Sequence, residues 1–222
     1  SDAAPQDETF AVHIEAAPSR FGKNLHLLRI AVKAKEIAKK DRLPLTITLV
    51  VDTSGSMADR GKIELVKQSL TLLVNELGEA DMVSIVKYSN DATVLLESSN
   101  DKKKILGVIG TLTPENSTNC EAGIRTGYNL AVKHFREQTT NRVILCSDGV
   151  ANVGMTGPDG IVDMLTTQRK KGIALTCLGY GITDYNDTLL EQLADKGDGG
   201  YYYLDTIKEA KRVHVDNLVS TM

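Results

Sequence analysis

Three separate segments of the chain carry oxygen-bearing side chains that could together bind a metal ion. These side chains are Asp52, Ser54, Ser56, Thr118 and Asp148. The first three follow the apolar run 45–51 in one short loop, and Asp148 follows a second apolar run, 142–146. Hard oxygen ligands without histidine or cysteine suit Mg²⁺, Mn²⁺ or Ca²⁺ rather than zinc.

These residue types predict a metal site with few direct carboxylates. The hydroxyls of Ser54 and Ser56 can bind a cation and stay neutral, and Thr118 offers another neutral oxygen. Asp52 and Asp148 supply negative charge, directly or through a water molecule. The bound ion would therefore stay electrophilic and keep an open position, which a carboxylate of a partner could fill.

Each segment taken alone also has a purely structural interpretation. Serine or aspartate after a strand often caps the following helix. Thr118 could cap the helix that follows it, and Asp148 could hold a turn with Gly149. Asn119 and Asn152 could surround the ion or simply make hydrogen bonds within their loops. The three segments together, each next to a strand or helix end, favour the metal site.

The elements that must position these side chains alternate between strands and helices from Leu45 onward. We predict strands at 45–51, 82–88, 92–96, 142–147, 173–179 and 201–204, and helices at 63–77, 101–109, 121–135, 158–171, 186–196 and 206–220. This alternation predicts an α/β fold, a doubly wound and mostly parallel sheet with helices on both faces. Right-handed crossovers then bring the loops after residues 51, 118 and 148 to the same sheet edge.

The first 43 residues differ from the rest of the chain. Residues 1–8 are polar, and we expect them to be disordered. Residues 9–15 and 25–37 partly alternate between apolar and polar side chains, which predicts a β-hairpin or two strands packed on the main domain.

Composition excludes several classes of function. The chain has 222 residues and a net charge of −3, which argues against non-specific nucleic-acid binding. It has no apolar stretch of the roughly 20 residues that span a bilayer, and no signal peptide. The start could be a mature or an engineered terminus. We expect the three cysteines, Cys120, Cys146 and Cys177, to be free thiols, two of them buried in apolar runs.

Motifs of common enzyme classes are missing from the sequence. It contains no phosphate-binding G-x-x-x-x-G-K-[ST] loop, no G-x-G-x-x-G after the first strand and no G-x-S-x-G nucleophile elbow. The four histidines, His13, His26, His134 and His214, lie outside the proposed metal loops. Asp52 as a phosphoryl acceptor would need a second aspartate two residues later, where this chain has Ser54. We therefore predict that the protein is not an enzyme.

The pattern D-x-S-x-S, a loop threonine and a strand-terminal aspartate resembles the metal-ion-dependent adhesion site (MIDAS) of von Willebrand factor type A domains. The resemblance covers the chain from about Leu43. It implies a Rossmann-like fold, a bound Mg²⁺ (or Mn²⁺, with Ca²⁺ also possible), and a protein partner whose exposed Asp or Glu completes the coordination. It also implies that the final helix, 206–220, shifts when a ligand binds. Bacterial members often have glycine where this chain has Asn116, a difference that bears on the position of Thr118.

Further segments are similar to bacterial YfbK-type proteins. They are 67–70, 141–143, 147–154 and 185–187. The resemblance implies residues 1–43 as a tail and β-strand extension, part of a leading β region, and 44–222 as the type A domain. It implies an exported protein or lipoprotein of the cell envelope, with membrane anchoring through a segment outside this chain. The alternatives are a cytoplasmic adaptor that couples a substrate to an AAA+ ATPase, and a structural domain that a metal only stabilises.

Overall fold

The structure is a computed structural model, which describes most of the chain. The described residues are 5, 8–22, 24–35, 42–115, 117–149, 158–181 and 187–214. The chain divides between Arg42 and Leu43 into two compact units. Each unit is described by itself below.

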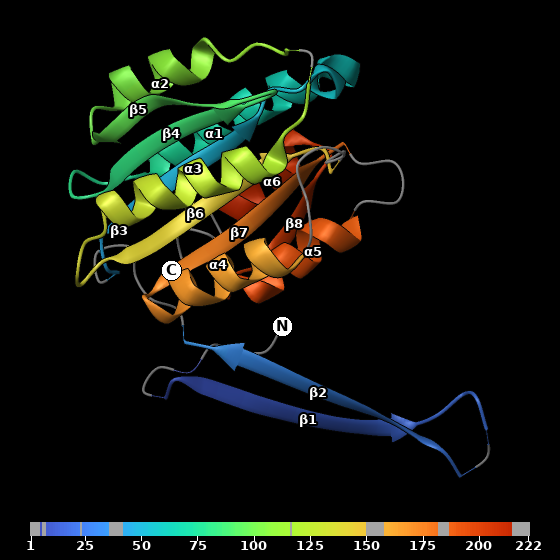
Figure 1. The fold of residues 1–222 in the computed structure, drawn as a ribbon. Helices are drawn as coiled ribbons and strands as arrows, with labels where there is room; N and C mark the ends of the chain where they lie inside the picture. The colour runs from blue at the N-terminus through green and yellow to red at the C-terminus, as the bar shows by residue number, and fades with distance from the viewer. Residues whose placement is uncertain are drawn as a thin grey trace. The chain divides into compact units, whose positions relative to one another are not determined.

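The larger unit is built around a six-stranded sheet in the order β5-β4-β3-β6-β7-β8 (Figure 1). The strands are β3 (Leu45–Asp52), β4 (Met82–Tyr88), β5 (Ala92–Ser99), β6 (Thr140–Ser147), β7 (Ile173–Tyr180) and β8 (Tyr201–Leu204). The edge strand β5 runs antiparallel to β4, and all other neighbours are parallel. The predicted doubly wound, mostly parallel sheet is therefore confirmed.

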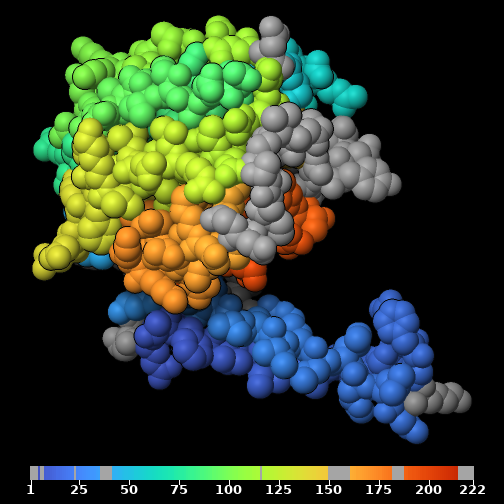
Figure 2. All heavy atoms as spheres, viewed as in Figure 1, coloured from blue at the N-terminus to red at the C-terminus, as the bar shows by residue number. Residues whose placement is uncertain are grey.

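Helices cover both faces of this sheet. They are η1 (Gly55–Gly61), α1 (Lys62–Glu76), α2 (Lys102–Gly110), α3 (Cys120–Lys133), α4 (Pro158–Lys170), α5 (Asp187–Lys196) and α6 (Ile207–Lys211). Apolar side chains of α1, α2 and α6 form one core with the sheet, and those of α3, α4 and α5 form a second. Figure 2 shows α3 and α4, in yellow-green and orange, over one face. The central strand β3 is buried along its whole length, as a strand covered on both faces must be.

Helix α3 lies unusually close to the sheet because small residues line its inner side. A Cβ added at Gly127 would lie 2.3 Å from Cγ2 of Val50, and one added at Gly123 would lie 2.5 Å from the ring of Tyr88. Neither position has room for a larger side chain. The close contact holds the beginning of α3 near the ends of β3 and β4, where the candidate site lies.

The smaller unit is an antiparallel ribbon of two strands, β1 (Phe10–Pro18) and β2 (His26–Ala34). The register pairs Val12 with Val32 and Ile14 with Ile30, so one face of the ribbon is apolar. On the other face Arg29 and Glu15 form an ion pair at 3.1 Å. The predicted hairpin is present, although the first strand continues to Pro18 and residues 36–37 lie outside the described range.

The structure also bears on the predictions for the final helix, the cysteines and a membrane-spanning segment. The final helix begins as expected, with Thr206 Oγ1 accepting a hydrogen bond from the backbone N–H of Glu209 at 3.3 Å. Of the predicted range 206–220, residues 215–220 lie outside the described part. All three cysteines are free, as predicted, and Cys120 is buried along with the two for which burial was expected. Within the described residues, no helix combines the length and the apolar composition needed to cross a bilayer.

Candidate metal centre

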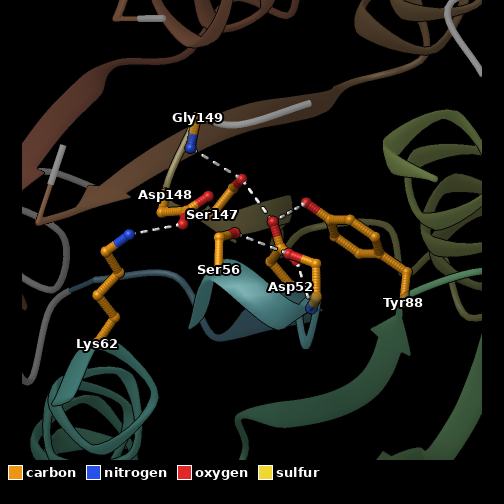
Figure 3. A network of polar contacts seen from close by, with 8 residues as sticks. Asp52, Ser56, Lys62, Tyr88, Ser147, Asp148 and Gly149 are labelled. Atoms are coloured by element: carbon orange, nitrogen blue, oxygen red, sulfur yellow. Dashed lines mark hydrogen bonds and ion pairs between the residues drawn. The ribbon is translucent and has the colours of Figure 1, made fainter. Parts of the chain in front are cut away.

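Asp52 is the centre of a buried polar cluster at the carboxyl-terminal edge of the sheet (Figure 3). One of its carboxylate oxygens, Oδ1, accepts a hydrogen bond from the backbone N–H of Ser54 at 2.8 Å. The other, Oδ2, accepts from Ser147 Oγ at 2.8 Å and from the Tyr88 hydroxyl at 3.1 Å. Tyr88 ends β4 and Ser147 ends β6, the two strands that flank β3. The parallel arrangement thus brings three strand ends to one carboxylate.

The environment of Asp52 disfavours a negative charge. Burial raises the pKa of the Asp52 carboxyl above its usual value, and the nearby charge of Asp148 acts in the same direction. Hydrogen bonds from Ser54 and Ser147 oppose this increase in pKa. Two buried carboxylates at one sheet edge repel each other, and a cation between them would relieve that repulsion.

The two serine hydroxyls of the first loop contact each other. Ser54 Oγ and Ser56 Oγ are 3.2 Å apart, and Figure 3 shows Ser56 beside Asp52 and Asp148. Ser54 occupies the N-cap position of η1, yet its side chain makes no capping hydrogen bond. The capping interpretation is therefore wrong for Ser54, and both hydroxyls remain placed beside the carboxylates.

Thr118 lies in the loop that leads into α3. The cap of this helix is Asn119, whose Oδ1 accepts a hydrogen bond from the first turn at 3.1 Å, so Thr118 is not the cap. Two backbone hydrogen bonds hold this loop near the ends of β3 and β4. The N–H of Asn119 donates to the carbonyl oxygen of Ser89 at 2.6 Å, and the N–H of Glu115 donates to the carbonyl oxygen of Thr53 at 2.5 Å. Within the described residues, no hydrogen bond joins Thr118 to the other four candidate ligands.

Asp148 binds a lysine that the sequence did not suggest. Its Oδ2 lies 2.8 Å from the Nζ of Lys62, the first residue of α1. In the alternative interpretation Asp148 could hold a turn with Gly149; the hydrogen bond to the Gly149 N–H is accepted by Ser147 Oγ, at 3.1 Å.

Sequence reasoning missed the roles of Tyr88, Ser147 and Lys62 at this cluster. Ser147 precedes Asp148 at the end of a strand, and this position could have identified Ser147 as a residue of the site. Tyr88 ends an apolar strand and looks like a core residue, and Lys62 looks like a solvated helix start. Asn116 and Asn152 lie outside the described residues. Cys120 is buried at the start of α3, and burial raises the pKa of its thiol to about 12.

The residues present fit a hard divalent cation. The described part of the chain contains no group of three or more His, Cys, Asp and Glu side chains placed to hold a metal ion. The cluster instead combines two carboxylates, Asp52 and Asp148, with the hydroxyls of Ser54 and Ser56. Such an all-oxygen set with little negative charge suits Mg²⁺ bound together with water molecules.

Comparison with known families agrees with this fold and arrangement. The sequence model of the von Willebrand factor type A domain matches residues 46–214, most of the chain. This chain belongs to the von Willebrand factor type A family. Such domains generally mediate protein–protein interactions and adhesion, are typically not enzymes, and commonly bind a divalent metal ion at a MIDAS.

Three known proteins illustrate the similarity. The chain is 38% identical over 207 residues to the uncharacterized protein YfbK of Escherichia coli, an alignment with 92% of this chain and 36% of that protein. The chain thus spans about a third of the length of this relative.

Two solved structures share the fold. An aerotolerance-related membrane protein from Bacteroides fragilis matches with a TM-score of 0.65 and 20% identity, over 80% of this chain and 100% of that one. Proximal thread matrix protein 1 from the mussel byssus, with a zinc-occupied MIDAS motif, matches with a TM-score of 0.64 and 21% identity, over 80% of this chain and 46% of that one.

Proposed function

We propose that this chain is a divalent-cation-dependent protein-binding module. In this proposal Asp52, Ser54, Ser56, Thr118 and Asp148 hold Mg²⁺, and an acidic residue of a partner completes the coordination. The observation that carries the proposal is the meeting of two buried carboxylates and two serine hydroxyls at one sheet edge. The raised pKa of Asp52 supports it, because a buried carboxylate in such surroundings gains most from a cation.

The chemistry of the donors explains why the partner would be acidic. Two carboxylates leave a bound divalent ion without excess negative charge, and the serine hydroxyls add none. A further anionic oxygen is then the best remaining ligand for a hard cation. A carboxylate supplied by another protein would make binding depend on the metal ion, and we propose this binding role in place of a catalytic one.

A peptide-display selection tests the acidic partner. The protein is immobilised in Mg²⁺, random peptides are bound, and the bound fraction is eluted with EDTA. We expect the recovered peptides to share an Asp or Glu whose change to Asn or Gln weakens binding by about tenfold or more, that is, by about 1.4 kcal/mol or more. An immobilised Asp52→Asn variant should recover none of them. Peptides that lack acidic residues, or that stay bound in EDTA, would contradict the proposal.

We also propose that the full-length protein belongs to the cell envelope and that residues 1–43 are part of a larger β region. The similarity to the aerotolerance-related membrane protein from Bacteroides fragilis supports a location in the cell envelope. The ribbon supports the β region, because its apolar face leaves Ile14 and Ile30 65% and 61% exposed, and two strands alone are marginally stable.

One experiment on the full-length protein tests both statements. After cell fractionation, the envelope fraction is treated with trypsin, for which the sequence 33–42 offers several lysines and an arginine. We expect the protein in that fraction, and a stable fragment that begins close to Leu43. Recovery from the cytoplasm would favour the adaptor function, and degradation of residues 44–222 together with the ribbon would contradict the domain boundary.

A further inference from the structure

Lys62 forms an ion pair with one of the two carboxylates of the candidate metal centre. Its Nζ lies 2.8 Å from Oδ2 of Asp148, and the side chains of Lys62 and Asp148 are 12% and 0% exposed. The other carboxylate, Asp52, is buried in the same cluster. Because water screens such a shielded pair poorly, the ammonium acts on Asp148 far more strongly than a surface lysine would.

The fold around Lys62 directs its side chain toward the site. The two preceding residues, Arg60 and Gly61, have positive φ angles of 49° and 71°, so the chain turns sharply just before α1. Gly181, at the end of β7, leaves room for the lysine stem, since an added Cβ there would lie 3.3 Å from Lys62 Cγ. A cavity of about 150 Å³, lined by Asp59, Arg60, Lys62 and Gly181, adjoins the stem. A displaced ammonium would therefore have space near the carboxylate of Asp59, in a cavity that the guanidinium of Arg60 also lines.

We propose that Lys62 is an internal counter-ion that competes with the divalent cation for Asp148 and so sets the metal affinity of the site. This inference rests on the proposed metal-dependent function. A cation that binds Asp148 must either displace the ammonium or bind next to its positive charge, and both weaken binding. The site would then take up its cation most readily when a partner carboxylate adds negative charge.

Calorimetric titration with Mn²⁺ alone tests the role of Lys62. We expect Lys62→Met to lower the dissociation constant for Mn²⁺ by about tenfold, which corresponds to about 1.4 kcal/mol. Lys62→Arg keeps the charge and should bind Mn²⁺ like the wild type. Lys67→Met is the matched control, because it removes the same net charge from the same helix. Lys67 pairs with the exposed Glu64 at 2.8 Å.

Thermal unfolding provides a second measurement that also shows whether the variant folds. In EDTA, Lys62→Met should melt about 5–10 °C below the wild type, because Asp148 keeps its burial but loses its counter-ion. Saturating Mn²⁺ should remove most of this difference. A lysine with a merely structural role would give the same loss of stability but no gain in metal affinity.

The outcomes separate this inference from the function on which it rests. If the wild type binds Mn²⁺ and Lys62→Met binds it equally or more weakly, the competition is wrong while the metal site stands. If neither protein binds Mn²⁺, the metal-dependent function is wrong as well. Tighter binding by Lys67→Met as well as Lys62→Met would reduce the effect to net charge and would also overturn the inference.

Discussion

Divalent cations are expected to raise the melting temperature of the wild-type protein and to leave that of an Asp52→Asn variant unchanged. A ligand that binds only the folded state, at 100 times its dissociation constant, adds about 2.7 kcal/mol to the free energy of unfolding. For a domain of this size that corresponds to an increase of about 5–11 °C. Scanning calorimetry in EDTA and then in Mg²⁺, Mn²⁺ or Ca²⁺ measures this increase in melting temperature.

The two proteins should behave differently in EDTA as well. Burial raises the pKa of Asp52, so near neutral pH its ionised form costs stability in the absence of a cation. An asparagine has the same shape without the charge, and the hydroxyls of Tyr88 and Ser147 can rotate to accept from its amide. We therefore expect Asp52→Asn to be at least as stable as the wild type in EDTA and less stable in saturating metal.

A matched control removes a carboxylate away from the site. Glu64 lies on the outer side of α1, where its side chain is 61% exposed, and Glu64→Gln changes the net charge by the same amount as Asp52→Asn. This control should respond to metal ions as the wild type does. An equal temperature increase in Asp52→Asn would place the cation elsewhere on the molecule and would contradict the assignment of Asp52.

Acid is expected to destabilise the protein between about pH 6.5 and pH 4 through His214. This side chain is fully buried three residues after the end of α6, and its Nε2 lies 2.6 Å from Ser69 Oγ, which also contacts the Tyr180 hydroxyl at 2.8 Å. No described residue forms a hydrogen bond with its Nδ1. Burial lowers the pKa of His214 from 6.5 to about 4.

The sign of the effect follows from the two pKa values. The unfolded chain takes up a proton at His214 near pH 6.5, whereas the folded protein does so only near pH 4, so between these values the unfolded state binds more protons. The stability is complete above pH 6.5 and is lost as the pH falls toward 4. A difference of about 2.5 between the two pKa values corresponds to about 3.4 kcal/mol at most.

Urea unfolding at about pH 4.5, 5.5, 6.5 and 7.5 measures how the free energy of unfolding depends on pH. Carboxylates also titrate at the acidic end, so the comparison is between variants. His214→Gln should show a smaller loss of stability with acid than the wild type. His134→Gln is the control, because His134 is only partly buried and its Nε2 lies 3.2 Å from the exposed carboxylate of Glu97. Identical pH dependence in the wild type and His214→Gln would contradict the role of the buried histidine.

Local pattern in the sequence was sufficient to predict the scaffold. Apolar runs such as 45–51 and 142–146 became strands buried on both faces, because only a strand covered by helices on each side needs no polar alternation. Helix α3 can lie close to the sheet because Gly123 and Gly127 have no side chain on its inner side. Right-handed crossovers then fixed which strand ends share an edge, and this placed Asp52 and Asp148 together.

Tertiary structure alone decided what surrounds these carboxylates. Tyr88 and Ser147 reach Asp52 because the strand order sets β4 and β6 on either side of β3, and no local pattern encodes strand order. Lys62 reaches Asp148 across 86 positions of sequence, although a lysine at a helix start is ordinarily solvated. Periodicity in a sequence shows which side of an element is buried. The identity of the side chain that it meets depends on how distant elements pack.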